Sequence, residues 1–142
     1  MMDFTGKVFI VTGASSGIGL SCAEQIIALG GRVIGVDKNA TDVDNDAFEY
    51  SVISVTDEQA VENLVNTVTD KYGHIDGLVN AAGIWGSSKP FYEMDSEAFQ
   101  NVLDVNTKGM FLMSKYVART MISQKRGKIV NISCIRASIF RN

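Results

Sequence analysis

The feature that most constrains the fold is an apolar run followed at once by closely spaced glycines. Val8–Val11 is short, continuous and apolar, which is typical of a strand buried on both faces. Gly13, Gly17 and Gly19 come directly after it. Apolar residues then recur at helical spacing, at Ile18, Cys22, Ile26 and Leu29, before a stop at Gly30-Gly31. The pattern predicts a buried strand, a glycine turn and a helix.

The rest of the chain continues to alternate between strand and helix patterns. Further strands are expected at Arg32–Val36, Phe48–Val55, Ile75–Asn80 and Lys128–Ser133. Helices are expected along the stripe Val61, Leu64, Val65, Val68 and Tyr72, and from an N-cap at Asp95 to about Gln124. Such alternation predicts an α/β fold with a doubly wound parallel sheet in a single domain spanning residues 1–142.

The last predicted strand has little chain after it. Only the nine residues Cys134–Asn142 follow, with no closing helix pattern. We therefore expect the sheet to be truncated after its fifth strand and the domain to be incomplete at its C-terminal end. The fifth strand should then lie at an open edge of the sheet.

Composition excludes several classes of protein. Of 142 residues, 46% are apolar and one is proline, which is unlike a disordered chain. A net charge of −3 argues against a nucleic-acid partner, and two cysteines with one histidine, His74, predict no metal site. Asp3 places an acidic residue where a signal peptide has basic ones. The longest uncharged run, residues 8–23, is too short to cross a membrane. We expect a cytoplasmic protein.

The glycine turn is a candidate phosphate-binding loop. Glycine tolerates positive φ and lets a ligand approach the backbone, while the start of a helix offers unpaired N–H groups to a pyrophosphate. The spacing here is G-x-x-x-G-x-G rather than G-x-G-x-x-G. A tight turn with no ligand is the alternative interpretation.

An acid follows at the end of the second strand. Asp37 lies 18 residues beyond Gly19, where a carboxylate can accept hydrogen bonds from both ribose hydroxyls of an adenosine and would repel a 2′-phosphate. No arginine lies in the glycine turn or next to Asp37. The sequence thus predicts NAD as cofactor in preference to NADP, with a solvated loop acid as the alternative.

Four motifs in this order resemble the short-chain dehydrogenase/reductase family, whose domain is a Rossmann-type fold. They are T-G-A-S-S-G-I-G (12–19), N-A-A-G (80–83), V-N-T-K-G (105–109) and I-V-N-I-S-C (129–134). The M-D-F-x-G-K opening also resembles 2,3-dihydro-2,3-dihydroxybenzoate dehydrogenases within that family. The resemblance and the acid together give as cofactor-binding candidates Gly13, Ser15, Ser16, Gly17, Ile18, Gly19, Asp37, Ser54, Val55, Asn80, Ala81, Ala82 and Gly83.

The resemblance implies hydride transfer between a nicotinamide and an alcohol or carbonyl substrate, by a homo-oligomer. In the family a serine positions the substrate oxygen; Cys134, a weaker hydrogen-bond donor, stands at that position here, and an alignment shifted by one residue would place Ser133 there instead. The resemblance also implies that Asn106 holds a water in a proton relay. From the residues alone, Asn106 interrupts the apolar stripe Phe99, Val102, Leu103, Met110, Met113 and Val117, so it is a polar bridge or a helix kink.

Besides Cys134, two further features depart from the family. The Y-x-x-x-K acid/base pair is absent, because the residues four beyond the four tyrosines are Ser54, Asp76, Ser96 and Thr120. Ser54 also stands where the family usually has an adenine-binding aspartate. We therefore expect the 142-residue chain to transfer no hydride at an appreciable rate by itself. A non-catalytic dinucleotide-binding module and an assembly subunit are the alternatives.

Overall fold

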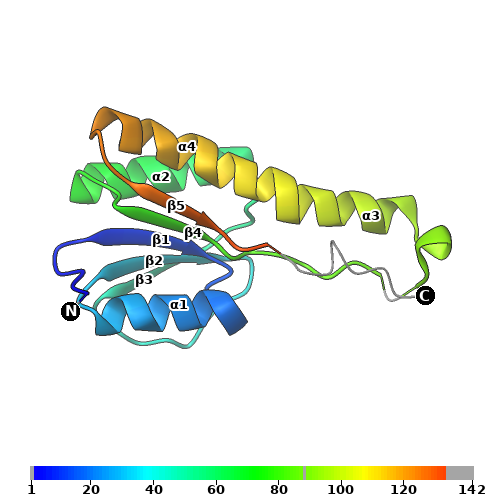
Figure 1. Ribbon diagram of the computed structural model, residues 1–142, viewed down its shortest axis with the longest axis horizontal. Coiled ribbons are helices and arrows are strands. Elements are labelled where there is room, and N and C mark those ends of the chain that lie inside the picture. Colours follow the sequence, from blue (N-terminus) through cyan, green and yellow to red (C-terminus); the bar gives the residue numbers. More distant parts are fainter. Residues whose placement is uncertain (1, 88, 134–142) are drawn as a thin grey trace.

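A computed structural model describes residues 2–87 and 89–133, which form a parallel sheet covered by helices on both faces (Figure 1). The strand order is β3-β2-β1-β4-β5. The strands are β1 (Val8–Thr12), β2 (Arg32–Asp37), β3 (Phe48–Val52), β4 (Gly77–Asn80) and β5 (Lys128–Asn131). The sheet is parallel and of the predicted Rossmann type, and among the described strands β5 lies at the predicted edge.

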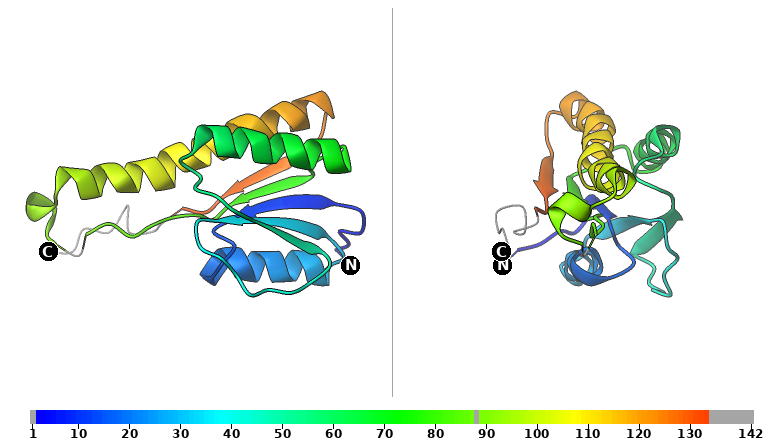
Figure 2. Two further views of the ribbon diagram at one scale, coloured as in Figure 1. Left: turned by 180° about the vertical axis from the view of Figure 1, so that it is seen from behind. Right: turned by 90° about the vertical axis from the view of Figure 1, so that its right-hand side faces the viewer.

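Helices cover the two faces unequally. The helices are α1 (Gly17–Ala28), α2 (Glu58–Tyr72), α3 (Ser96–Leu103) and α4 (Met110–Ser123). α1 lies alone on one face, while α2 and α4 lie side by side on the other (Figure 1). α3 continues the line of α4 and extends past the end of the sheet (Figure 2). Phe99 and Leu103 are therefore exposed, although they belong to the predicted apolar stripe.

Alternation along the central strands builds a core on each face. Ile10 and Ile34 belong to the cluster that packs under α2 and α4, and both are nearly inaccessible. Their neighbours Val11 and Val33 belong to the smaller cluster under α1. Because successive side chains of a strand point to opposite faces, continuous apolar runs are what a sheet covered on both sides requires.

Three of the strands are shorter than predicted: β3 ends at Val52, β4 begins at Gly77 and β5 ends at Asn131. β3 stops early because a turn begins at Ser54, whose Oγ accepts the Thr56 N–H at 3.3 Å. Hydrogen bonds inside this turn replace those of the sheet. The predicted strand patterns were right in place and order, and too long by up to three residues.

The predicted helices also need correction. Ile18 was expected on the buried stripe of α1, but it is 60% exposed, because it lines an open cleft at the start of the helix; Cys22 is half-buried. The long helix is interrupted by a π-helical turn at Asp104–Gly109. Asp95 does precede α3 as predicted, yet its carboxylate pairs with Lys89 at 3.0 Å instead of capping the helix.

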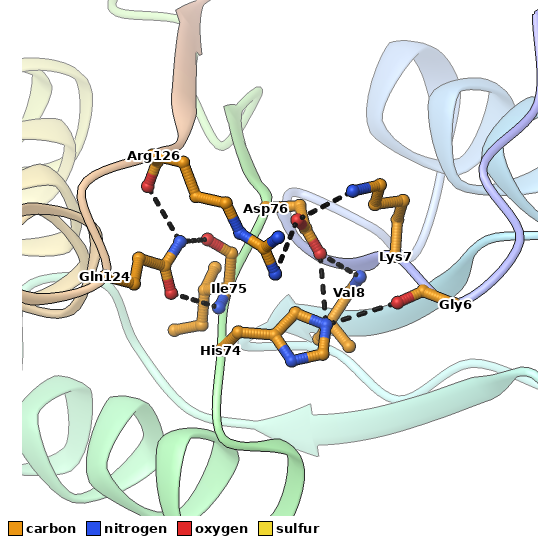
Figure 3. Close-up of polar contacts among 8 residues, drawn as sticks. All are labelled: Gly6, Lys7, Val8, His74, Ile75, Asp76, Gln124 and Arg126. Carbon is orange, nitrogen blue, oxygen red and sulfur yellow. Dashed lines mark hydrogen bonds and ion pairs between the residues drawn. The ribbon is translucent and has the colours of Figure 1, made fainter.

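A buried carboxylate fastens the amino-terminal ends of the strands (Figure 3). Asp76 precedes β4, its side chain is 10% exposed, and Oδ2 accepts the Val8 N–H at 3.0 Å. Three cationic or basic groups surround it: Lys7 at 3.5 Å, Arg126 at 3.5 Å and His74 Nε2 at 3.2 Å. This cluster, the Asp76 clamp, joins the start of β1, the start of β4 and the segment before β5.

A glutamine secures the same end of the sheet. Gln124 Oε1 accepts the Ile75 N–H at 3.1 Å, while Nε2 donates to the carbonyls of Ile75 at 2.6 Å and Arg126 at 2.7 Å (Figure 3). The amide thus ties the end of α4 to the chain that enters β4. The amino-terminal edge of the sheet is closed by polar contacts between these described segments.

Replacing Asp76 tests the clamp. We expect Asp76→Ala to lower the free energy of unfolding by about 2 kcal/mol or more, because the Val8 N–H loses its carboxylate acceptor and three basic groups lose their counter-charge. Asp76→Asn, which keeps an acceptor, should cost less. Urea unfolding measures the loss of stability in both variants.

The control is Asp70→Ala on the exposed face of α2, which should change stability by no more than about 0.5 kcal/mol. Equal effects of Asp76→Ala and Asp70→Ala would contradict the assignment.

Candidate cofactor site

A cleft of about 320 Å³ opens at the carboxyl ends of the strands. Ligands of open α/β sheets bind at this edge, where the connections diverge. The residues that line it are Gly13, Ser15, Ser16, Gly17, Ile18, Gly19, Asp37, Lys38, Asn39, Ile53, Ser54, Val55, Ala81, Ala82, Gly83, Ile84 and Val105. The cleft therefore brings together twelve of the thirteen cofactor-binding candidates, all except Asn80.

The glycines of the turn allow backbone to pack on backbone. Gly13 has φ +68°, and a Cβ built there would lie 2.8 Å from both the Ala81 oxygen and the Ala82 nitrogen. A Cβ at Gly19 would overlap the carbonyl of Gly13. Any side chain at either position would push the turn away from the helix or from the β4 loop. These two glycines set the shape of the cleft floor.

Thr12 connects the turn to the loop after β4. Its buried Oγ1 accepts the N–H groups of Ala81 at 3.1 Å and Ala82 at 3.0 Å. These amides would otherwise be unpaired, because the chain leaves the sheet here. Thr12 belongs to the glycine-turn motif, but its bridging role is not apparent from the sequence; its position as the last residue of β1 was the available signal.

The start of α1 presents amides to the cleft. Ser16 is the N-cap residue, and its side chain makes no capping hydrogen bond among the described residues. In α2, by contrast, Asp57 accepts the Ala60 N–H at 3.0 Å. The first N–H groups of a helix have no partner inside it and carry its positive dipole end. The first turn of α1 can therefore receive an anionic group from the cleft.

Asp37 lies at the end of β2 and faces the turn. Its Oδ2 accepts the Ser15 Oγ–H at 2.8 Å and the Ser15 N–H at 3.3 Å, and its Oδ1 accepts the Asn39 N–H at 3.0 Å. Among the described cleft residues, Lys38 has the one cationic side chain. The sequence prediction of NAD rested on the lack of a nearby arginine and left Lys38, next to Asp37, out of account.

Asn80 lies behind the cleft rather than in its lining. Its side chain is buried, with Nδ2 donating to Ser114 Oγ at 3.0 Å and to Asn131 Oδ1 at 2.9 Å. Within the described part of the chain, Oδ1 has no hydrogen-bond partner. The amide therefore connects β4 to α4 and β5, which differs from the expected place of this residue beside the cofactor.

Asn106 bridges two segments. Its Oδ1 accepts the Ile84 N–H at 2.8 Å and its Nδ2 donates to the Ile84 carbonyl at 3.0 Å. It lies in the π-helical turn, so the polar bridge and the helix irregularity weighed from the sequence occur together. Ser133 is exposed after β5, and Cys134 lies outside the described residues.

A family model described as short chain dehydrogenase matches residues 7–139 of this sequence. The match spans the sheet, the glycine turn and both helix-covered faces described above. The chain belongs to the short-chain dehydrogenase/reductase family. Its members named below are oxidoreductases, and its solved structures share the parallel sheet found here.

Individual relatives agree with this assignment. An uncharacterized oxidoreductase of Staphylococcus saprophyticus is 38% identical over 145 residues, which cover 95% of this chain and 62% of that protein. A sorbitol-6-phosphate 2-dehydrogenase of Klebsiella pneumoniae is 32% identical over 93% of this chain and 53% of the enzyme. The chain thus spans about half to three-fifths of the length of these relatives.

A solved structure extends the comparison to the fold. The short-chain dehydrogenase of Leptospira borgpetersenii, solved with bound NAD⁺, superposes with a TM-score of 0.90 at 29% identity. The match covers 98% of this chain and 56% of that one.

Residues 2–87 and 89–133 hold neither a metal-binding cluster nor a membrane-spanning helix. These residues contain no group of three or more His, Cys, Asp or Glu side chains placed to hold a metal ion. None of their helices has the length and apolarity needed to cross a membrane.

The glycine turn offers a matched pair of substitutions. We expect Gly19→Ala to lower the free energy of unfolding by about 2 kcal/mol or more, because its Cβ meets the backbone of Gly13. Gly17→Ala should cost about 1 kcal/mol, since its φ is +55° but a Cβ there meets nothing within 4 Å. Urea unfolding of the two variants measures the difference; a larger loss from Gly17→Ala would contradict the packing described.

Proposed function

We propose that residues 1–142 form the NAD(H)-binding domain of a short-chain dehydrogenase that interconverts an alcohol and a carbonyl compound. The single observation that carries the proposal is the cleft in which an uncapped helix start, a close-packed glycine turn and a carboxylate at the end of β2 lie together. When bound, the nicotinamide supplies the carbon that accepts or donates hydride. The chain's own residues bind and orient the dinucleotide.

Each part of the cleft fits one part of the dinucleotide. The amides at the start of α1 would hold the pyrophosphate, as helix N-termini hold anions elsewhere. Asp37 would accept hydrogen bonds from the adenosine ribose, and Ser54 with Val55 would contact the adenine. Residues 81–84 would lie toward the nicotinamide end.

The carboxylate of Asp37 favours NAD over NADP in this proposal. A 2′-phosphate would bring a second anion against it, and Ser15 already fixes that carboxylate toward the cleft. Lys38 is the group that could offset the repulsion, so the balance between Asp37 and Lys38 decides how strong the preference is. The NAD⁺ named with the Leptospira structure supports the same cofactor.

Chemistry on the substrate needs groups beyond the cleft. Asn106, through its bridge to Ile84, would position the loop near the nicotinamide, and Ser133 or Cys134 would hold the substrate oxygen. The sequence contains no tyrosine followed four residues later by lysine to move the proton. We therefore propose that this 142-residue polypeptide binds the dinucleotide without turning over an alcohol by itself.

The assembly state and location complete the proposal. Phe99, Phe111 and Ile122 expose apolar side chains along α3 and α4, which supports a homo-oligomer that buries them. The cytoplasm, where nicotinamide cofactors are held, is the proposed compartment.

Cofactor titration tests the proposal. We expect NADH fluorescence to report binding at least about tenfold tighter than that of NADPH, since repulsion of about 1.4 kcal/mol suffices for that ratio. Asp37→Ser should weaken the binding of NADH and strengthen that of NADPH, because Lys38 then faces the 2′-phosphate without a neighbouring carboxylate. Asp42→Ser, in the exposed loop after β2, is the control and should leave both affinities unchanged. Tighter binding of NADPH by the unaltered chain would overturn the NAD assignment.

A further inference from the structure

Tyr50 of β3 packs across a glycine of the neighbouring strand β2. In the parallel pairing of β2 and β3, Tyr50 stands opposite Gly35. A Cβ at Gly35 would lie 2.8 Å from Tyr50 Cδ2 and 2.6 Å from Phe48 Cζ, so the missing side chain makes room for both rings. The two rings pack with centroids 5.7 Å apart, which fixes the direction of the tyrosine.

The tyrosine hydroxyl holds the turn that follows Asp37. Tyr50 Oη donates to the carbonyl of Asn39 at 2.6 Å. Asn39 in turn donates to Asp37 Oδ1, from its N–H at 3.0 Å and from Nδ2 at 3.4 Å. A displacement of Asn39 would therefore release one oxygen of the carboxylate.

The other oxygen of the same carboxylate is held from the glycine turn. Ser15 donates to Asp37 Oδ2 through its hydroxyl at 2.8 Å and its N–H at 3.3 Å. A carboxylate accepts about four hydrogen bonds, and here donors from two separate segments hold both oxygens. The carboxylate has one orientation before any ligand arrives.

Electrostatics keep the tyrosine in its donating form. Burial raises the pKa of Tyr50, and the negative charge of Asp37 raises it further, while a hydrogen bond from Ser15 acts in the opposite direction. The net shift is upward from an ordinary value of about 10. At neutral pH the phenol retains its proton, and its O–H donates a hydrogen bond to the Asn39 carbonyl.

We propose that Tyr50 is a positioning residue for dinucleotide binding: through Asn39 it holds the Asp37 carboxylate in the orientation that receives the adenosine ribose. This proposal rests on the proposed function, because it requires that Asp37 bind the ribose. Preorganisation raises affinity by removing the entropy cost of ordering the group upon binding. The tyrosine itself does not line the cleft, so its effect is indirect.

A double-mutant cycle tests the proposal by NADH fluorescence titration. Tyr50→Phe keeps the ring and removes one hydrogen bond, and we expect the Kd for NADH to rise about three- to tenfold. In an Asp37→Ala background the same substitution should leave the Kd unchanged, because the group it positions is gone. Tyr92→Phe, at an exposed tyrosine remote from the cleft, is the matched control and should have no effect in either background.

The outcomes separate the two proposals. If the unaltered chain binds NADH but Tyr50→Phe binds it equally well, the positioning role is wrong and the proposed function stands. If Tyr50→Phe raises the Kd for NADH equally in the presence and absence of Asp37, the positioning role is also wrong, since such a result would report a general effect on the fold. If the unaltered folded chain binds no NADH, the proposed function fails and the positioning role fails with it. Urea unfolding of Tyr50→Phe shows whether the variant has lost its fold. In that case Ser15→Ala takes its place in the cycle, since Ser15 donates to the other oxygen of the Asp37 carboxylate.

Discussion

The contact on which the structure depends most is the packing of the glycine turn against the backbone on either side of it. Gly13 meets the loop after β4, and Gly19 meets Gly13, at distances that exclude a Cβ. Thr12 then uses one hydroxyl to hold two amides of that loop. Two segments far apart in sequence, residues 12–19 and 81–82, are thereby joined at the carboxyl edge of the sheet without a side chain filling the space. The same absence of side chains leaves the edge open to a ligand.

The two edges of the sheet have opposite properties. At the amino-terminal edge, the Asp76 clamp and Gln124 satisfy the polar groups between strands and loops. At the carboxyl edge, the helix start is uncapped by Ser16, and the hydroxyl of Ser15 and the carboxylate of Asp37 face a cleft. Polar contacts thus secure one end of the fold, while the other end keeps polar groups available for binding.

Much of this arrangement could be predicted from the sequence because residue type alone restricts it. The parallel α/β sheet and the residues of the cleft follow from apolar runs, glycine spacing and an acid at the end of β2. What the sequence did not reveal depends on contacts between distant residues. The partner of Asn106 is Ile84, 22 residues earlier, and the π-helical turn follows from neither periodicity nor composition. Asn80 belongs to a family motif, yet its contacts with Ser114 and Asn131 depend on how β4 packs.

Tyr50 illustrates the same limit within the candidate site. The sequence predicts only that Tyr50 is an aromatic residue of a strand, and no neighbouring residue indicates a role in the site. Its role depends on the register that sets it opposite Gly35 and on the direction of the 37–39 turn. Neither follows from local sequence, since register is a property of two strands.

The most direct test of this account is an amide NMR titration of the 142-residue chain with NAD⁺. The account predicts that the signals of residues 13–19 and 37–39 move, while those of residues 74–76 and 124–128 at the opposite edge stay in place. Unchanged signals in the glycine turn of folded protein, or changes confined to the opposite edge, would contradict it.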